Sequence, residues 1–169
     1  SAIVRNLAPE RISTFPDSPT YGKTISYPNE SQVFSILKLE NGIAGTLSVN
    51  GDSTIQDQAH FMIYGKKGIL KLSDPNTFGG DVIYLPAQKD FKDHPAPQIL
   101  NYGFSYSENS RGLGPSEMAD AIFEKRTNRA NAELAVHVLD VIDHMVESSE
   151  KCAFVQVDST CTRPEPMPL

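Results

Sequence analysis

The residues best suited to chemistry lie on a long helical segment, residues 130–150. Two histidines and two carboxylates recur there at helical spacing: His137, Asp140, His144 and Glu147. On a helix this spacing places the four side chains on one stripe, and imidazole and carboxylate are ligand types that bind Zn²⁺. The histidines, however, are about 10 Å apart along the axis, whereas a zinc-binding helix places two histidines four residues apart. We therefore expect the hydrated back of an amphipathic helix in preference to a metal site.

A second polar set follows the predicted strand at 43–50. Asn50, Asp52 and Ser53 offer amide, carboxylate and hydroxyl groups where that strand ends. A hydroxyl-rich substrate requires such paired donors and acceptors. The same residue types are also common in ordinary polar turns, and that alternative stays open.

Three more residues complete the candidate substrate-binding set. Asn76 and Phe78 lie within DPNTFGG, residues 74–80, whose composition is more typical of a turn than of a ligand site. Arg111 precedes a predicted helix, where a guanidinium can bind a carboxylate or fix a loop, and we favour the loop role. No serine lies in a nucleophile-elbow context, so we nominate no catalytic residue.

Composition limits the class of protein. The chain has 169 residues and a net charge of −6, which predicts one domain and argues against nucleic acid as a partner. It contains no apolar run of roughly 18 residues, so no membrane is expected. Two cysteines, Cys152 and Cys161, do not suggest a disulfide scaffold, and no signal peptide is visible. Cytoplasmic localisation is the expectation.

Local patterns predict an α+β fold, with an open, mainly antiparallel sheet and helices packed on one face. The first nine residues are expected to be half of a helix, ended by Pro9. Residues 31–50 predict a hairpin with a two-residue turn at Asn41-Gly42. Helices are expected from Pro115 to Arg126 and after Asn131. The expected loops are 16–29 and 90–103, and the other expected strands are 12–15, 59–64, 69–73, 81–85 and 153–157.

The predicted strand at 59–64 alternates in character. Phe61 and Ile63 are two residues apart, so they should share one face, which we expect to be buried. His60, Met62 and Tyr64 occupy the other face, which looks too apolar to stay bare. We expect a homo-oligomer through that face.

Four segments together resemble the C-terminal domain of the Gfo/Idh/MocA family of NAD(P)-dependent oxidoreductases: YGKKGIL at 64–70, DPNTFGG at 74–80, RGLGPSEMADAI at 111–122 and RANAELAVHVLDVI at 129–142. The resemblance implies a ferredoxin-like, dehydrogenase-type domain spanning residues 1–169 of a larger two-domain enzyme. It also implies a sugar, inositol or related polyol as substrate. Residues 1–12 would continue a helix that carries catalytic residues upstream of Ser1.

The cofactor belongs to the other half of such an enzyme. A Rossmann half would bind NAD or NADP, and this chain is expected to bind neither, because Arg111–Gly114 lacks the third glycine of the dinucleotide fingerprint. The isolated chain should therefore be inactive. Two rivals remain: a stand-alone interaction or scaffold module that uses the open sheet, and a small metal-dependent hydrolase that uses the His137 stripe.

Overall fold

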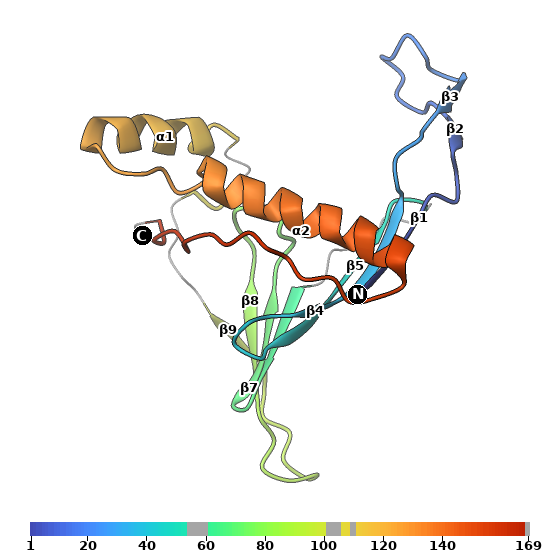
Figure 1. Cartoon of the computed structure of the whole chain (residues 1–169). Coiled ribbons are helices and arrows are strands. Elements are labelled where there is room, and N and C mark those ends of the chain that lie inside the picture. The colour runs from blue at the N-terminus through green and yellow to red at the C-terminus, as the bar shows by residue number, and fades with distance from the viewer. Residues whose placement is uncertain (54–60, 101–105, 109–110, 168–169) are drawn as a thin grey trace. The chain divides into compact units, whose positions relative to one another are not determined.

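The computed structural model describes residues 1–53, 61–100, 106–108 and 111–167 (Figure 1). Its contacts divide the chain into two compact units, Ser1–Ile55 with Ala132–Arg163 and Gln56–Asn131 with Pro164–Leu169. All strand pairs among the described residues are antiparallel, and the two described helices follow the strands in the sequence. The predicted α+β class is confirmed, whereas the single-domain organisation of residues 1–169 stays a prediction.

The first unit contains two small sheets and a long helix. Its three-stranded sheet has the order β1-β4-β5, and its two-stranded sheet pairs β2 with β3. The bounds are β1 (Ala2–Arg5), β2 (Glu10–Ile12), β3 (Thr24–Ser26), β4 (Gln32–Lys38), β5 (Ala44–Asn50) and α2 (Ala132–Lys151). The predicted loop at 16–29 therefore includes a short strand, and the predicted strand at 12–15 lies earlier, at β2. Helix α2 begins directly after Asn131, as predicted.

The prediction that the chain opens with half of a helix is wrong. Residues Ala2–Arg5 form β1, which pairs antiparallel with β4 from Ala2 opposite Ser35 to Arg5 opposite Gln32. Ile3 and Val4 are β-branched and favour a strand, and three apolar residues in so short a segment do not define a helical period. The expectation that residues 1–12 continue a catalytic helix falls with it.

The hairpin predicted at 31–50 is present, but its turn is longer than expected. The Leu39 amide donates to the Ile43 carbonyl at 2.8 Å, and the Gly42 amide donates to the Leu39 carbonyl at 2.9 Å. Gly42 has φ +84°, which is a left-handed conformation that glycine adopts without strain. The connection is therefore a three-residue loop ending in a left-handed glycine.

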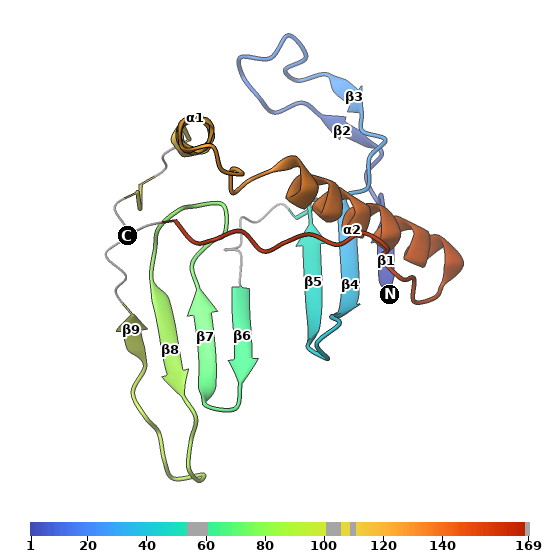
Figure 2. The same ribbon diagram turned by 60° about the vertical axis from the view of Figure 1, so that its left-hand side comes forward.

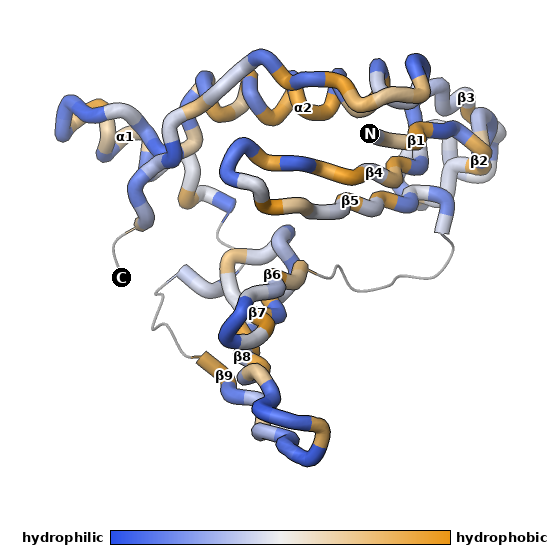
Figure 3. The backbone as a smooth tube through the Cα atoms, turned by 60° about the horizontal axis from the view of Figure 1, so that its bottom comes forward, coloured by the Kyte–Doolittle hydropathy of each residue, from blue (hydrophilic) through white to orange (hydrophobic). Residues whose placement is uncertain are grey.

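Helix α2 packs against β1, the edge strand of the three-stranded sheet. Buried Ser148 accepts the Ala2 amide at 2.9 Å through its Oγ, and the Ser149 hydroxyl accepts the Val4 amide at 2.9 Å. Hydrophobic and hydrophilic residues alternate along this helix (Figure 3), and Met145 is buried on it. The two serines satisfy donors that an edge strand would otherwise present to another chain.

The second unit contains a four-stranded sheet whose strands β6, β7, β8 and β9 lie side by side in that order (Figure 2). The bounds are β6 (Phe61–Gly65), β7 (Gly68–Leu72), β8 (Val82–Pro86), β9 (Gln98–Leu100) and α1 (Leu113–Glu124). The predicted strands at 59–64, 69–73 and 81–85 correspond to β6, β7 and β8. Wherever the ends lie within the described residues, prediction and structure differ by one residue. Strand β9 falls inside the predicted loop 90–103, because three residues give too little alternation to recognise. The described strands form three antiparallel sheets. Residues 54–60, including His60, lie outside the described residues.

The prediction that Phe61 and Ile63 are buried is wrong. They share one face of β6, as their spacing requires, but their side chains are 49% and 48% exposed. Opposite that face, Met62 and Tyr64 pair in register with Lys71 and Ile69 of β7. The four-stranded sheet is therefore apolar on both faces, and among the described residues only Ala2, Ala121 and Met145 are buried apolar side chains. Neither described helix has the length and apolar character to cross a bilayer.

Candidate functional site

The end of β5 carries a compact polar cluster in the first unit. Asp52 accepts Arg11 Nη2 at 2.5 Å on one carboxylate oxygen and the Ser31 hydroxyl at 2.7 Å on the other. Asn50 Oδ1 accepts the Asp52 amide at 3.1 Å and Gln32 Nε2 at 3.3 Å. The predicted residues Asn50 and Asp52 thus lie together, but Asp52 is occupied by internal partners.

Arg11 holds this cluster against the segment around β2 and β3. Its guanidinium carbon lies 4.2 Å from the centre of the Tyr27 ring, its Nε donates to the Ala8 carbonyl at 3.2 Å, and its Nη1 donates to the Gly51 carbonyl at 3.4 Å. A planar guanidinium suits stacking and forked donation at the same time. The arrangement fixes the direction in which the chain leaves β5.

The Asn50 amide is the polar group of this cluster that points to solvent. The side chain is exposed, and among the described residues its Nδ2 donates to none. Ser53, also exposed, is the last described residue before the gap at 54–60. Asn50 therefore presents an accessible amide nitrogen at this strand end, and Ser53 is an exposed residue beside it.

The remaining predicted residues belong to the second unit. In the 74–80 loop, Asp74 Oδ1 accepts the Asn76 amide at 2.8 Å and the Asp74 carbonyl accepts the Thr77 amide at 3.0 Å, an Asx-type turn. Phe78 is partly exposed in the same loop, and Arg111 is exposed just before α1. Asn76 and Phe78 therefore share a loop, and Arg111 lies apart from it in sequence.

The His137 stripe, expected to be the hydrated back of the helix, is only half-buried but is partly covered by another segment of the chain. It binds the extended tail, residues 153–163, which runs alongside α2 (Figures 1 and 2). His137 Nδ1 lies 2.8 Å from Ser159 Oγ, and Asp140 Oδ2 accepts the Ser159 amide at 3.1 Å. Nowhere in the described part of the chain do three His, Cys, Asp or Glu groups converge as metal ligands would.

The same tail replaces the predicted strand at 153–157, which pairs with no described strand. The Ser148 hydroxyl donates to the Ala153 carbonyl at 2.6 Å, and the Thr162 amide donates to Glu133 Oε1 at 3.1 Å. Side chains of α2 therefore satisfy tail backbone groups that a neighbouring strand would otherwise pair.

Charges along this stripe stabilise one another. Hydrogen bonding from Ser159 lowers the pKa of Asp140, with His144 and His137 adding to the shift. The Asp140 carbonyl accepts His144 Nδ1 at 2.7 Å, which raises the pKa of His144 with help from the neighbouring carboxylates. The stripe thus favours charged Asp140 and protonated His144 at mildly acidic pH.

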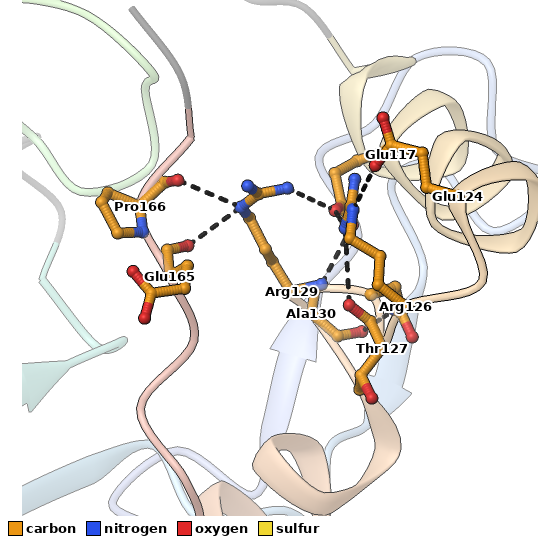
Figure 4. A network of polar contacts seen from close by, with 9 residues as sticks. Glu117, Glu124, Arg126, Thr127, Arg129, Ala130, Glu165 and Pro166 are labelled. Carbon is orange, nitrogen blue, oxygen red and sulfur yellow. Dashed lines mark hydrogen bonds and ion pairs between the residues drawn. The ribbon is translucent and has the colours of Figure 1, made fainter.

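A second polar network joins α1 to the segments around it in the second unit (Figure 4). Buried Glu117 accepts Arg126 Nη1 and, at 2.7 Å, Arg129 Nη1 on one oxygen, and the Arg129 amide at 3.0 Å on the other. Arg129 Nε reaches on to the carbonyls of Glu165 and Pro166 at 2.9 and 3.2 Å. One carboxylate therefore connects α1, the turn before α2 and the end of the tail.

Hydrogen bonds from Arg126, followed by the Arg129 amide, lower the pKa of Glu117 to about 2. Arg126 also pairs with Glu124 at 2.5 Å. Because Glu117 accepts hydrogen bonds on both oxygens and stays ionised near neutral pH, the network is suited to holding the backbone and not to proton transfer.

The described residues contain no dinucleotide site of the Rossmann kind. Such a site lies at the ends of parallel strands, where a glycine-rich turn leads into a helix. The described strands are all antiparallel, and α1 begins at Leu113 without a described strand directly before it. No step of a hydride transfer can be assigned to these residues.

Sequence reasoning missed the residues that organise both networks. Arg11 and Asp52 are 41 positions apart, and no local pattern links them. Glu117 and Arg129 lie within segments that carry the family resemblance, and two arginines shortly after the helix that contains Glu117 were the only available signal.

Comparisons with known proteins agree with this architecture. The profile described as "Oxidoreductase family, C-terminal alpha/beta domain" matches residues 4–157. Among curated proteins, none matches the chain. Among solved structures, levoglucosan dehydrogenase in complex with NADH and L-sorbose has a TM-score of 0.69 at 16% identity over 94% of this chain. Its complex with NADH has a TM-score of 0.68 at 17% identity over 94%, and its apo form 0.67 at 18% over 93%.

At these identities the likeness shows the fold. The chain spans 44%, 44% and 45% of the three dehydrogenase chains, respectively. The profile covers nearly the whole sequence, including the four segments that carry the resemblance. The chain belongs to the Gfo/Idh/MocA oxidoreductase family, as its C-terminal alpha/beta domain.

Proposed function

We propose that this chain is the substrate-side domain of a two-domain, NAD(P)-dependent oxidoreductase that acts on CH–OH groups of a sugar or polyol, inositol-like compounds included. The family match over residues 4–157 carries the proposal. The fold neighbours support the substrate class, because they are dehydrogenases of the sugar levoglucosan and one contains L-sorbose. The domain contributes substrate binding and positioning, and the cofactor half contributes the hydride acceptor.

Within the domain, the end of β5 is the proposed place of substrate contact. Exposed Asn50 and Ser53 supply the hydrogen-bonding groups, and the Arg11–Asp52 pair fixes the backbone from which they project. Asp52 accepts two internal hydrogen bonds, so its role in this proposal is to position and not to touch the substrate. Asn76, Phe78 and Arg111 remain proposed substrate-binding residues.

In this proposal, NAD or NADP binds to a separate N-terminal half, which also supplies the acid–base residues. The two NADH complexes among the fold neighbours support this division. We also propose a cytoplasmic location, which accords with Cys152 and Cys161 both being free thiols.

Turnover tests the proposal. The full-length protein should reduce NAD⁺ or NADP⁺ with at least one member of a panel of sugars, inositols and linear polyols, followed at 340 nm, whereas the isolated chain should not exceed a no-protein control. In the full-length protein, Asn50→Ala should lower kcat/KM about tenfold by removing one hydrogen bond to substrate. Asn29→Ala, an exposed amide in a different loop, is the matched control and should leave kcat/KM unchanged.

Two results would contradict the proposal: turnover by the isolated chain, or a folded full-length protein without turnover on any polyhydroxy compound. Equal losses of kcat/KM in Asn50→Ala and Asn29→Ala would show that the substrate does not contact Asn50 at the end of β5.

The rival function, a stand-alone interaction or scaffold module, is favoured by one observation. The four-stranded sheet exposes apolar side chains on both faces, including Tyr64 and Ile99 on one and Phe61 and Ile63 on the other. Such surfaces mark contacts with other protein.

Assembly through this sheet is compatible with either function, and we propose a homodimer through the face that carries Met62 and Tyr64. Light scattering should give a dimer for the wild type. Met62→Lys with Tyr64→Lys should give a folded monomer, because two lysines cannot be desolvated cheaply. A Lys66→Ala and Lys67→Ala control in the exposed turn should remain dimeric. A monomeric wild type, or a dimeric double-lysine variant, would exclude this interface.

A further inference from the structure

Helix α1 leaves several large apolar side chains exposed. Glu117 and Ala121 are buried, whereas Met118, Ile122 and Phe123 are 49%, 73% and 92% exposed. A helix turns about 100° per residue. Measured from Glu117, the three exposed side chains therefore lie about 100°, 140° and 240° around the axis.

Two more apolar residues, Pro115 and Ala119, fall within the same arc, at about 160° and 200°. The polar residues Ser116, Asp120 and Glu124 fall outside it, between about 260° and 340°. This apolar arc, Pro115, Met118, Ala119, Ile122 and Phe123, is the α1 apolar face. A surface helix normally directs such an arc inward, whereas here the arc is exposed together with the polar residues.

The orientation of the helix is held by its ion pairs. Glu117 is bound by Arg126 and by both the side chain and the amide of Arg129, which prevents α1 from rotating its apolar face toward the residues that follow it. Five apolar residues that are neighbours on the surface of a rigidly held helix indicate a surface that another protein domain covers.

We propose that the α1 apolar face is the docking surface for the N-terminal half of the full-length protein. This proposal rests on the proposed function, in which that half exists and binds the dinucleotide. The chain spans 44% of a fold neighbour's length, and the matching profile is a C-terminal domain. A second domain of comparable size in the same polypeptide is therefore the partner that we expect to cover this face.

The size of the face favours a tethered partner over a second copy. Helix α1 has 12 residues, so it is about 18 Å long and its apolar arc covers on the order of 200 Å². A stable association between separate proteins buries about 800 Å² on each partner. A covalently linked domain needs much less, because the linker supplies a high effective concentration.

Cysteine accessibility tests the docking. Ile122→Cys would be placed in the isolated chain and in the full-length protein, with Cys152 and Cys161 changed to serine. Alkylation by iodoacetamide at micromolar protein is then followed by peptide-resolved mass spectrometry. Ile122→Cys should react at least tenfold more slowly in the full-length protein, independently of protein concentration. Asp120→Cys, two residues away on the polar side, is the matched control and should react equally in both.

Equal reactivity of Ile122→Cys in the two proteins would overturn the docking. So would protection already present in the isolated chain, which would mean that the chain itself or a second copy covers the face. Should Ile122→Cys fail to fold, hydrogen exchange of wild-type α1 peptides replaces it: exchange at least tenfold slower in the full-length protein supports docking, and unchanged exchange contradicts it. Turnover reports the proposed function separately, because an inactive protein can still protect Ile122→Cys and an active one can leave it reactive.

Discussion

Replacing Glu117 with glutamine should lower the melting temperature by several degrees and remove much of the acid sensitivity of folding. The pKa of Glu117 falls from 4.5 to about 2 in the folded protein, chiefly through the hydrogen bond from Arg126 and then that from the Arg129 amide. A carboxyl group with a depressed folded pKa stabilises the fold above its unfolded pKa. That contribution is lost as the pH falls from about 4.5 toward 2.

The amide of glutamine cannot carry the charge that Arg126 and Arg129 both contact, and it introduces donors that face two guanidinium groups. Melting curves between pH 7 and pH 2 measure the effect. The wild type should lose stability steeply below about pH 4.5, and Glu117→Gln should start lower and lose less. Asp140 and Glu147, whose pKa values are also lowered, leave a residual acid dependence in both proteins.

Glu124→Gln is the control for this experiment. Glu124 is an exposed carboxylate that pairs with Arg126 alone among the described residues, so its replacement should shift the melting temperature little. Parallel melting curves for Glu117→Gln and the wild type from pH 7 to pH 2 would show that the network does not hold the fold.

Replacing Gly68 with alanine should destabilise the protein by about 3 kcal/mol or more, since backbone strain adds to steric overlap. Gly68 has φ +148°, and a Cβ placed on it would lie 2.2 Å from the Leu85 carbonyl oxygen and 2.7 Å from Cε2 of the Tyr84 ring. Both neighbours belong to β8, which pairs with β7 through Gly68 opposite Pro86. Relief of the overlap requires the β6–β7 hairpin to move away from β8.

Urea denaturation followed by circular dichroism measures this loss. Gly42→Ala is the matched control, because Gly42 also has a positive φ, +84°, but a Cβ placed on it would meet nothing within 4 Å. It should cost only about 1 to 2 kcal/mol for the left-handed conformation. Equal costs at the two positions would mean that β8 does not constrain the turn.

Local patterns in the sequence determined the elements whose signals are confined to a few neighbouring residues. The β4–β5 hairpin, the strands β6, β7 and β8 where they are described, and the start of α2 after Asn131 were all predicted. Alternation, turn residues and a 20-residue amphipathic period are properties of short segments, so they can be recognised without knowledge of the rest of the chain. The resemblance to the oxidoreductase family also came from contiguous segments, and the family profile confirms it.

Prediction failed for short segments whose structure depends on pairing with a strand distant in the sequence. β1 and β9 are too brief for periodicity to distinguish them, and only their pairing with β4 and β8 makes them strands. The predicted strand at 153–157 failed for the converse reason: the described residues give it no partner strand, and side chains of α2 bind its segment.

Tertiary structure alone decided what the polar residues do. Asp52 was predicted as a substrate contact, but Arg11 and Ser31, distant in sequence, engage both of its carboxylate oxygens. The His137 stripe was expected to be hydrated, but the tail returns to it through Ser159. Residue type and spacing specify which groups a side chain offers, whereas the partner that satisfies those groups depends on which distant segments the fold brings within hydrogen-bonding distance.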